Sequence, residues 1–185
     1  MPYRGRPAAP FTTSTRQQEA SRKLRLSSRE TRRVAQNLYE NGFIAYMRTD
    51  SAALSKQAIA AARAQAASLY GADSIPDEPR KYGKVAKGAQ EAHEAIRPSG
   101  DSFRTPSQTG LTGAQAALYD LIWKRTVASQ MADATGSTAT VKVAAPVRIG
   151  ADSATAEYSA SGTVITFRGF LAAYEESRDA SRYSK

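Results

Sequence analysis

The sequence predicts an α+β protein in which a mostly helical domain is followed by a small β segment. Up to about residue 132, several stretches begin with helix-capping residues and repeat their apolar residues at helical spacing. Beyond Asp133 the pattern alternates and becomes rich in Val, Thr and aromatic residues, as strands do. We expect a lead-in at 1–6, a helical domain at 7–132, a β segment at 133–178 and a tail at 179–185.

Capping patterns place two helices between residues 14 and 41. Ser14 with Gln17 forms one candidate capping box, and Ser27 with Glu30 forms another. Gly42 suits the left-handed position that follows a helix. The two helices in succession predict a helix-turn-helix-like core, and "FIAYMR" directly after Gly42 predicts a short strand.

The remaining elements follow from the same reasoning. We predict a helix from the Ser55 cap to Gly71, a short one over "QEAHEAIR", and a long one after Thr112, where Gln115 completes a capping box. The lead-in, with its prolines, is expected to be irregular. The late stretches "STATVKVAA", "SATAEYSA" and "GTVITFRGF" predict two or three strands. So small a sheet is marginal alone, so we expect a piece of a larger protein.

Composition limits the possible functions. The chain has 185 residues, no cysteine and one histidine, which excludes a zinc site built from thiolates or several imidazoles. A net charge of +9 favours a polyanionic partner, most commonly nucleic acid. No apolar run approaches the roughly 20 residues of a membrane span. We therefore expect a soluble, cytoplasmic protein without a membrane partner.

The stretch "YMRTDS" places a phenol beside a guanidinium. A phenol has a pKa of about 10 and attacks well only when a positive charge stabilises the phenolate. On a strand, Tyr46 and Arg48 would point to the same side. On a helix, His93 and Arg97 would share a face, and a phosphate would give both a role. Taken singly, each pattern is more often structural than catalytic.

Taken together, the motifs are specific. "PFTTSTRQQEASRKL" at 10–24, "YMRTDS" at 46–51 and "QEAHEAIRPS" at 90–99 resemble bacterial type IA DNA topoisomerases, in particular topoisomerase I. The resemblance runs from about Pro7 to Tyr174. It implies an enzyme that cuts one DNA strand through a 5′-phosphotyrosine, passes the intact strand through the gap and reseals the break without ATP. Such an enzyme relaxes negative supercoils.

The resemblance also implies roles for single residues. Tyr46 would be the nucleophile, Arg48 would hold the scissile phosphate, and His93 would lie near that phosphate. Arg16 stands where the family usually has an aliphatic residue, so either it lies on the surface or the local packing differs. Positioning roles are implied for Thr49, Asp50 and Ser51, and a phosphate-binding or structural role for Arg97.

The family's nucleotidyl-transfer domain, with its acidic magnesium-binding cluster, and most of the gate have no counterpart in this sequence. The resemblance implies Mg²⁺ in the full-length enzyme, with ligands outside this chain and no metal bound here. Residues 133–178 would be strands of the arch. The expected partners are single-stranded and negatively supercoiled DNA and the missing domains. The isolated chain is expected not to relax plasmid DNA.

Two alternatives remain at this stage. One is a stand-alone basic helix-turn-helix DNA-binding module in which Tyr46 is an ordinary strand residue. The other is a folded but inert fragment. A simple DNA-binding module does not require both "YMRTDS" and "QEAHEAIRP". The presence of both motifs therefore favours the enzyme over the binding module.

Overall fold

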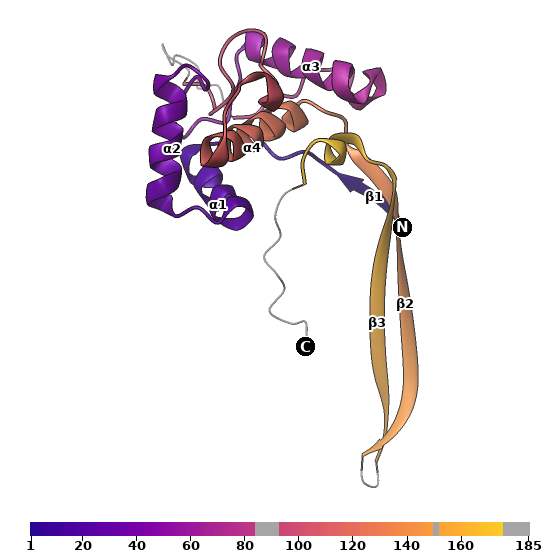
Figure 1. The fold of residues 1–185 in the computed structure, drawn as a ribbon. Coiled ribbons are helices and arrows are strands. Elements are labelled where there is room, and N and C mark those ends of the chain that lie inside the picture. Colours follow the sequence, from indigo (N-terminus) through magenta and orange to yellow (C-terminus); the bar gives the residue numbers. More distant parts are fainter. Residues whose placement is uncertain (84–92, 150–151, 176–185) are drawn as a thin grey trace.

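The computed structural model describes residues 1–83, 93–149 and 152–175. These residues form four α-helices and a three-stranded antiparallel sheet, so the predicted α+β class is confirmed. The helices gather at one end of the molecule, and two long strands project from them as an arm (Figure 1). In chain order the elements are β1 (Pro2–Gly5), α1 (Thr13–Leu24), α2 (Ser28–Glu40), α3 (Lys56–Tyr70), α4 (Gly113–Ser129), β2 (Ala134–Ile149) and β3 (Asp152–Phe167).

Helices α1 and α2 form the predicted helix-turn-helix-like core. The capping box of α2 is the predicted one, with Ser27 and Glu30. That of α1 begins two residues earlier than predicted, because Thr12, and not Ser14, receives the N–H of Thr15. A three-residue turn joins the helices. After α2, Gly42 adopts the left-handed conformation expected of it, with φ of 72°.

Helix α4 is the centre of the hydrophobic core. It packs against α1, α2 and α3, and its buried residues lie on all sides of the helix. Four buried alanines of α3 allow that helix to lie close to α4. The predicted limits of α3, the Ser55 cap and Gly71, are confirmed. Thr112 precedes α4 as predicted, but it makes no side-chain capping bond. No helix in the described ranges is long and apolar enough to cross a membrane.

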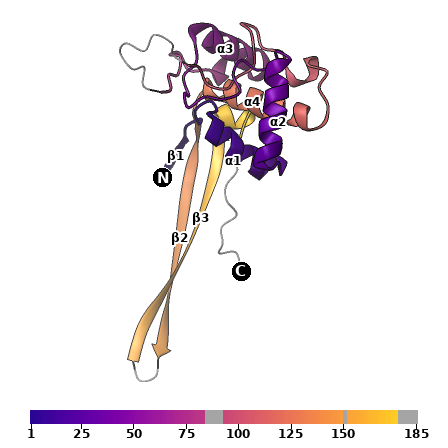
Figure 2. The same cartoon turned by 90° about the vertical axis from the view of Figure 1, so that its left-hand side faces the viewer.

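The arm is a single long hairpin. Strands β2 and β3 pair from Thr135 with Phe167 to Ile149 with Asp152, and the hairpin twists along its length (Figure 2). The second predicted stretch and residues 162–167 of the third thus form one continuous strand, whereas the end of the third stretch enters a short 3-10 helix at Gly169–Ala172. The lead-in was predicted to be irregular, and this was wrong for Pro2–Gly5, because β1 pairs with the first residues of β2. Large apolar side chains on the arm are exposed, among them Val141, Val143, Tyr158 and Val164.

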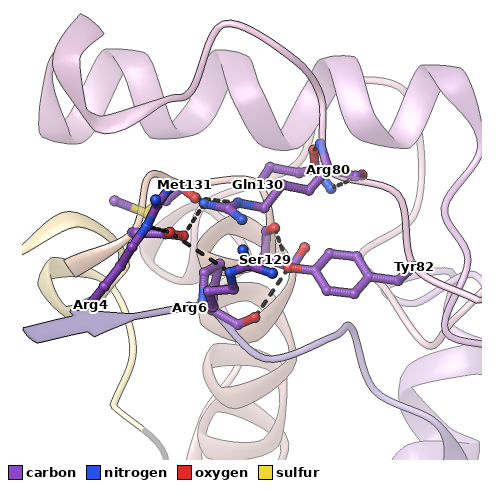
Figure 3. A network of polar contacts seen from close by, with 9 residues as sticks. Arg4, Arg6, Arg80, Tyr82, Ser129, Gln130 and Met131 are labelled. Carbon is purple, nitrogen blue, oxygen red and sulfur yellow. Dashed lines mark hydrogen bonds and ion pairs between the residues drawn. The ribbon is translucent and has the colours of Figure 1, made fainter. Parts of the chain in front are cut away.

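Asp133 joins the helical part to the sheet. It lies between α4 and β2, is buried, and forms ion pairs with Arg4 of β1 and with Arg80. Arg80 also donates from Nε to the carbonyl of Met131 at 2.8 Å, and its backbone N–H donates to Gln130 Oε1 at 3.1 Å (Figure 3). One carboxylate therefore connects three segments that are distant in sequence.

Tyr82 ties the same region to the lead-in. Its single hydroxyl proton is shared between the carbonyl of Ser129, at 2.9 Å, and that of Pro7, at 3.2 Å (Figure 3). Burial raises the pKa of this phenol, so the hydroxyl keeps its proton and both hydrogen bonds at neutral pH. The end of α4, residues 80–82 and the chain leading to α1 are thereby held together.

The Asp133 ion pairs predict a loss of stability in acid. Burial opposes ionisation of Asp133, but hydrogen bonds from Arg4 and Arg80 outweigh it and hold the pKa of this carboxyl below its ordinary 3.8. A depressed carboxyl pKa contributes stability that is present above the ordinary value and is lost as pH falls through the folded value. We expect Asp133→Asn to lower the free energy of unfolding at pH 7 by about 2 kcal/mol and to weaken its decline in acid.

Urea unfolding followed by circular dichroism between neutral and acid pH measures both effects. The control is Asp120→Asn on α4, which removes the partly exposed 2.8 Å pair with Lys124 and should change stability by less than about 1 kcal/mol. If Asp133→Asn and Asp120→Asn gave the same small change at pH 7, Asp133 would not hold the sheet to the helices.

Candidate active site

The segment that carries Tyr46 leaves α2 at Gly42. Its first residues are fixed by the end of that helix, because the N–H of Phe43 donates to the carbonyl of Leu38 at 2.8 Å and Ile44 is buried in the core. The predicted short strand is reduced to a single bridge between Ile44 and Pro98, and Tyr46 lies beside it in irregular backbone. The physical reason is that the next residues hydrogen-bond to α1 and to turns of their own.

Both neighbours of Tyr46 are held by hydrogen bonds. On one side the N–H of Ala45 donates to the carbonyl of Arg97 at 2.9 Å. On the other the carbonyl of Met47 accepts a bond from Arg16 Nη1 at 2.8 Å. Tyr46 itself is half-buried. Its backbone is therefore fixed on both sides while its side chain stays accessible, as a preorganised nucleophile requires.

A second clamp fixes the residues after Arg48. The N–H of Thr13, the first residue of α1, donates to the carbonyl of Thr49 at 2.9 Å, and the N–H of Thr49 donates to Thr13 Oγ1 at 2.9 Å. The hydroxyls of Thr49 and Ser51 then accept the N–H groups two residues on, at 3.0 and 3.1 Å. Both hydroxyls thus shape the loop, whereas Asp50 is exposed.

Two cavities share Arg48 as a lining residue. The first is lined by the start of α1, residues 12–14, and by Arg48, Thr49 and Asp50. The second is lined by Thr13, Arg16, Gln17, Arg32 and Arg48. The first turn of α1 contains no acidic residue, so the positive end of the helix dipole adds to the charge of Arg48. Asp50 adds one negative charge to the first cavity, and the described lining of the second is free of acidic residues, so the surface around Arg48 as a whole suits phosphate oxygens. Tyr46 lines neither cavity.

Arg16 is the site residue whose position the sequence left open. Its side chain is buried, with 1% of its surface exposed, so the local packing differs from that of an aliphatic residue at this place. Burial, together with the charges of Arg48 and Arg32, lowers its pKa to about 10, which still leaves it charged at neutral pH. Arg32 was not among the predicted site residues, because helix α2 carries other exposed arginines and no local signal separates Arg32 from them.

The second motif is extended where the structure describes it. A helix over "QEAHEAIR" was predicted; residues 90–92 lie outside the described residues, and from His93 onward the chain is not helical. Instead, the N–H of Ala95 donates to the carbonyl of Ala53 at 2.7 Å, and that of Ile96 to the carbonyl of Phe11 at 2.8 Å. Backbone pairing with distant segments replaces the helical bonds. His93 and Arg97 therefore do not share a helix face.

Arg97 makes its ion pair and its hydrogen bonds with groups of the protein itself. It is buried, pairs with Glu94 at 2.6 Å and donates to the carbonyl of Pro98 at 2.9 Å. Burial opposes ionisation of Glu94, but hydrogen bonds from Arg97 and Ser55 hold the pKa of this carboxyl below its usual range. Because Ser55 caps α3, the pair connects the second motif to that helix.

His93 is exposed at the start of the same extended segment. Within the described ranges, no hydrogen bond or ion pair joins its imidazole to Tyr46 or Arg48. Its place is set by Ala95, two residues on, which is bonded to the loop that follows Ser51. In the same ranges no three Asp, Glu, His or Cys side chains gather in a way that could hold a metal ion.

Comparison with known proteins identifies the family. The sequence profile described as DNA topoisomerase matches residues 2–184. The chain belongs to the DNA topoisomerase family. Its sequence is 62% identical over 178 residues to DNA topoisomerase 1 of Streptomyces coelicolor, a match that covers 96% of this chain and 18% of that protein. DNA topoisomerase 1 of Synechococcus elongatus is 56% identical over 178 residues, with 96% and 19% covered.

A solved structure supports the same family membership. Full-length topoisomerase I from Thermotoga maritima matches all of this chain and 30% of its own, with a TM-score of 0.71 and 32% identity. The chain thus spans about a fifth of the length of the curated topoisomerases it resembles. The family membership covers the helical part and the arm alike.

Proposed function

We propose that this chain is the tyrosine-bearing part of a type IA DNA topoisomerase, an ATP-independent enzyme that relaxes negatively supercoiled DNA. The observation that carries the proposal is the position of Tyr46. Its backbone is held between two hydrogen bonds, and Arg48, two residues on, lies at the positive N-terminus of α1. A phenol two residues before a guanidinium that lines a cavity suited to phosphate suits transesterification.

In the proposed reaction the Tyr46 oxygen attacks the phosphorus of one phosphodiester in single-stranded DNA. A bond from that oxygen to phosphorus forms, the bond from phosphorus to the 3′ oxygen breaks, and the leaving oxygen takes up a proton as the phenol loses one. Arg48 stabilises the charge that grows on the phosphate oxygens. One phosphate ester replaces another, so no ATP is required, and attack by the 3′ hydroxyl reverses the step.

The other predicted residues support these two. We assign positioning roles to Thr49 and Ser51 through their turns, with Asp50 exposed beside Arg48. We assign a structural role to Arg97, since Glu94 and backbone carbonyls engage its guanidinium. His93 is proposed to reach the phosphate once DNA is bound, because it is exposed on the segment that pairs with the Tyr46 loop.

The remaining parts of the activity are assigned to residues beyond these 185. We propose that the nucleotidyl-transfer and gate domains of the same enzyme hold the broken ends and bind any catalytic Mg²⁺. The expected location is the bacterial cytoplasm, where the DNA substrate lies.

A chimera tests the proposal. In the chimera, the matching residues of the Streptomyces coelicolor topoisomerase are replaced by this sequence. The Streptomyces protein supplies the rest of the chain. The chimera is incubated with a single-stranded oligonucleotide labelled at its 5′ end or at its 3′ end, and denaturing gels detect protein bound covalently to label. We expect adduct with the 3′ label only, because Tyr46 stays on the 5′ phosphate of the downstream piece.

Adduct with the 5′ label would contradict the proposed polarity. A chimera that binds the oligonucleotide, folds as judged by circular dichroism and forms no adduct would instead support the stand-alone DNA-binding function. Relaxation of supercoiled plasmid by the same chimera separates strand cleavage from the complete cycle of cleavage, passage and resealing.

A further inference from the structure

The second cavity at Arg48 contains more positive charge than the proposed cleavage chemistry uses. Three arginines line it, from three different segments: Arg16 of α1, Arg32 of α2 and Arg48 of the loop. The other lining residues, Thr13 and Gln17, are neutral and can donate hydrogen bonds. None of the described residues that line this cavity is acidic. Like charges gathered in this way repel unless an anion lies among them.

Arg16 adds an independent observation. Its guanidinium is almost fully buried, yet its Nε has no hydrogen-bond partner among the described residues. Within the same residues, the hydrogen bond that the guanidinium makes runs from Nη1 to the carbonyl of Met47. A buried donor without a partner destabilises the folded protein. Burial and the neighbouring charges of Arg48 and Arg32 lower the Arg16 pKa, and an anion bound in the cavity would offset the repulsion between the three guanidinium groups.

We propose that Arg16, Arg32 and Arg48 form a second phosphate site, which binds a backbone phosphodiester of the same DNA strand next to the phosphate that Tyr46 attacks. This inference rests on the proposed function. It adds that the strand is held at two phosphates, with Arg48 shared between them because it lines both cavities. Holding two neighbouring phosphates fixes the direction of the strand as well as its position.

The position of the site connects DNA binding to the nucleophile. Arg16 is bonded to the carbonyl of the residue that follows Tyr46. A phosphate that accepts from Arg16 therefore lies one side chain away from the nucleophile's backbone. Strand binding and tyrosine placement then depend on the same guanidinium.

Salt dependence measures the number of phosphates that are contacted. The 185-residue chain is titrated with a fluorescein-labelled single-stranded oligonucleotide by anisotropy at several salt concentrations. Each phosphate neutralised on a single strand contributes about 0.7 to the slope of log affinity against log salt. We expect Arg32→Gln and Arg16→Leu each to reduce the slope by about 0.7, which makes the loss of affinity between about 50 and 200 mM salt roughly threefold smaller.

The matched control is Arg33→Gln. Arg33 is the next residue on α2, is exposed and loses the same charge on substitution, but does not line the cavity. Its slope should equal that of the unchanged chain. Arg32 is exposed as well, so Arg32→Gln tests the site even if the buried Arg16→Leu variant fails to fold.

Oligonucleotides with one neutral methylphosphonate at a time locate the phosphate. At one position, the methylphosphonate should weaken binding to the unchanged chain. The same oligonucleotide should bind the Arg32→Gln variant as tightly as the unmodified oligonucleotide does. Titration calorimetry with inorganic phosphate tests the alternative source of the same chemistry. Suppose that Arg32→Gln abolishes the heat of phosphate binding but leaves the slope of log DNA affinity against log salt unchanged. The site would then bind free phosphate, and the DNA assignment would be overturned.

Equal slopes for Arg32→Gln, Arg33→Gln and the unchanged chain would also overturn the proposal, as would absence of DNA binding at low salt. These outcomes are independent of Tyr46, because binding is measured without cleavage. The proposed cleavage function fails by a different result, namely the absence of a correctly oriented covalent adduct.

Discussion

Tyr46→Phe in the chimera should abolish the covalent protein–DNA adduct and leave non-covalent binding of single-stranded DNA nearly unchanged. The substitution removes the attacking oxygen and keeps the ring and its packing. The backbone bonds at Ala45 and Met47 do not involve the phenol, so the loop should retain its shape. Adduct is measured on denaturing gels with the 3′-labelled oligonucleotide, and binding is measured by anisotropy.

Tyr39→Phe is the matched control. Tyr39 is an exposed tyrosine at the end of α2, so the same atom is removed a few residues away, and adduct should form as in the unchanged chimera. If Tyr46→Phe still formed adduct, another tyrosine would have to be the nucleophile. Tyr82 is a poor candidate, because its hydroxyl proton is already shared between two backbone carbonyls and burial raises its pKa.

Arg48→Ala should slow adduct formation by roughly a hundredfold, which corresponds to about 3 kcal/mol of lost transition-state stabilisation. The nucleophile stays in place, but the phosphate loses a preorganised donor as its charge grows. Arg48→Lys should restore the rate only in part, because an ammonium cannot reproduce the planar fork of a guanidinium. Single-turnover adduct formation at saturating oligonucleotide measures the rate apart from binding.

The comparison with Arg33→Ala separates a local effect from a general loss of charge. Arg33 is exposed on α2 and lines neither cavity, so its removal should weaken binding slightly and leave the saturated rate unchanged. An Arg48→Ala rate within a few-fold of the Arg33→Ala rate would mean that Arg48 only attracts DNA. In that case the growing charge on the phosphate would be stabilised by another group.

Much of this protein follows from local sequence. The start of α2 was predicted correctly because Ser27 and Glu30 bond to each other's backbone within one turn, so no distant residue is needed. The limits of α3 follow in the same way from Ser55 and Gly71. The change to β structure after Asp133 was visible as alternation. The three motifs at 10–24, 46–51 and 90–99 together were sufficient to suggest the family, to which the chain belongs.

The details of the site were decided by the tertiary structure. The loop with Tyr46 is not a strand, and His93 does not begin a helical turn, because backbone groups in both segments bond to partners far away in the sequence. Strand β1 exists only because β2, more than a hundred residues later, offers it an edge. Arg16 is buried because Met47 provides an acceptor, and it meets Arg32 and Arg48 only when three segments fold together. Capping and alternation act within a few residues, and so they can be predicted from sequence, whereas long-range hydrogen bonds and the meeting of like charges depend on the folded chain.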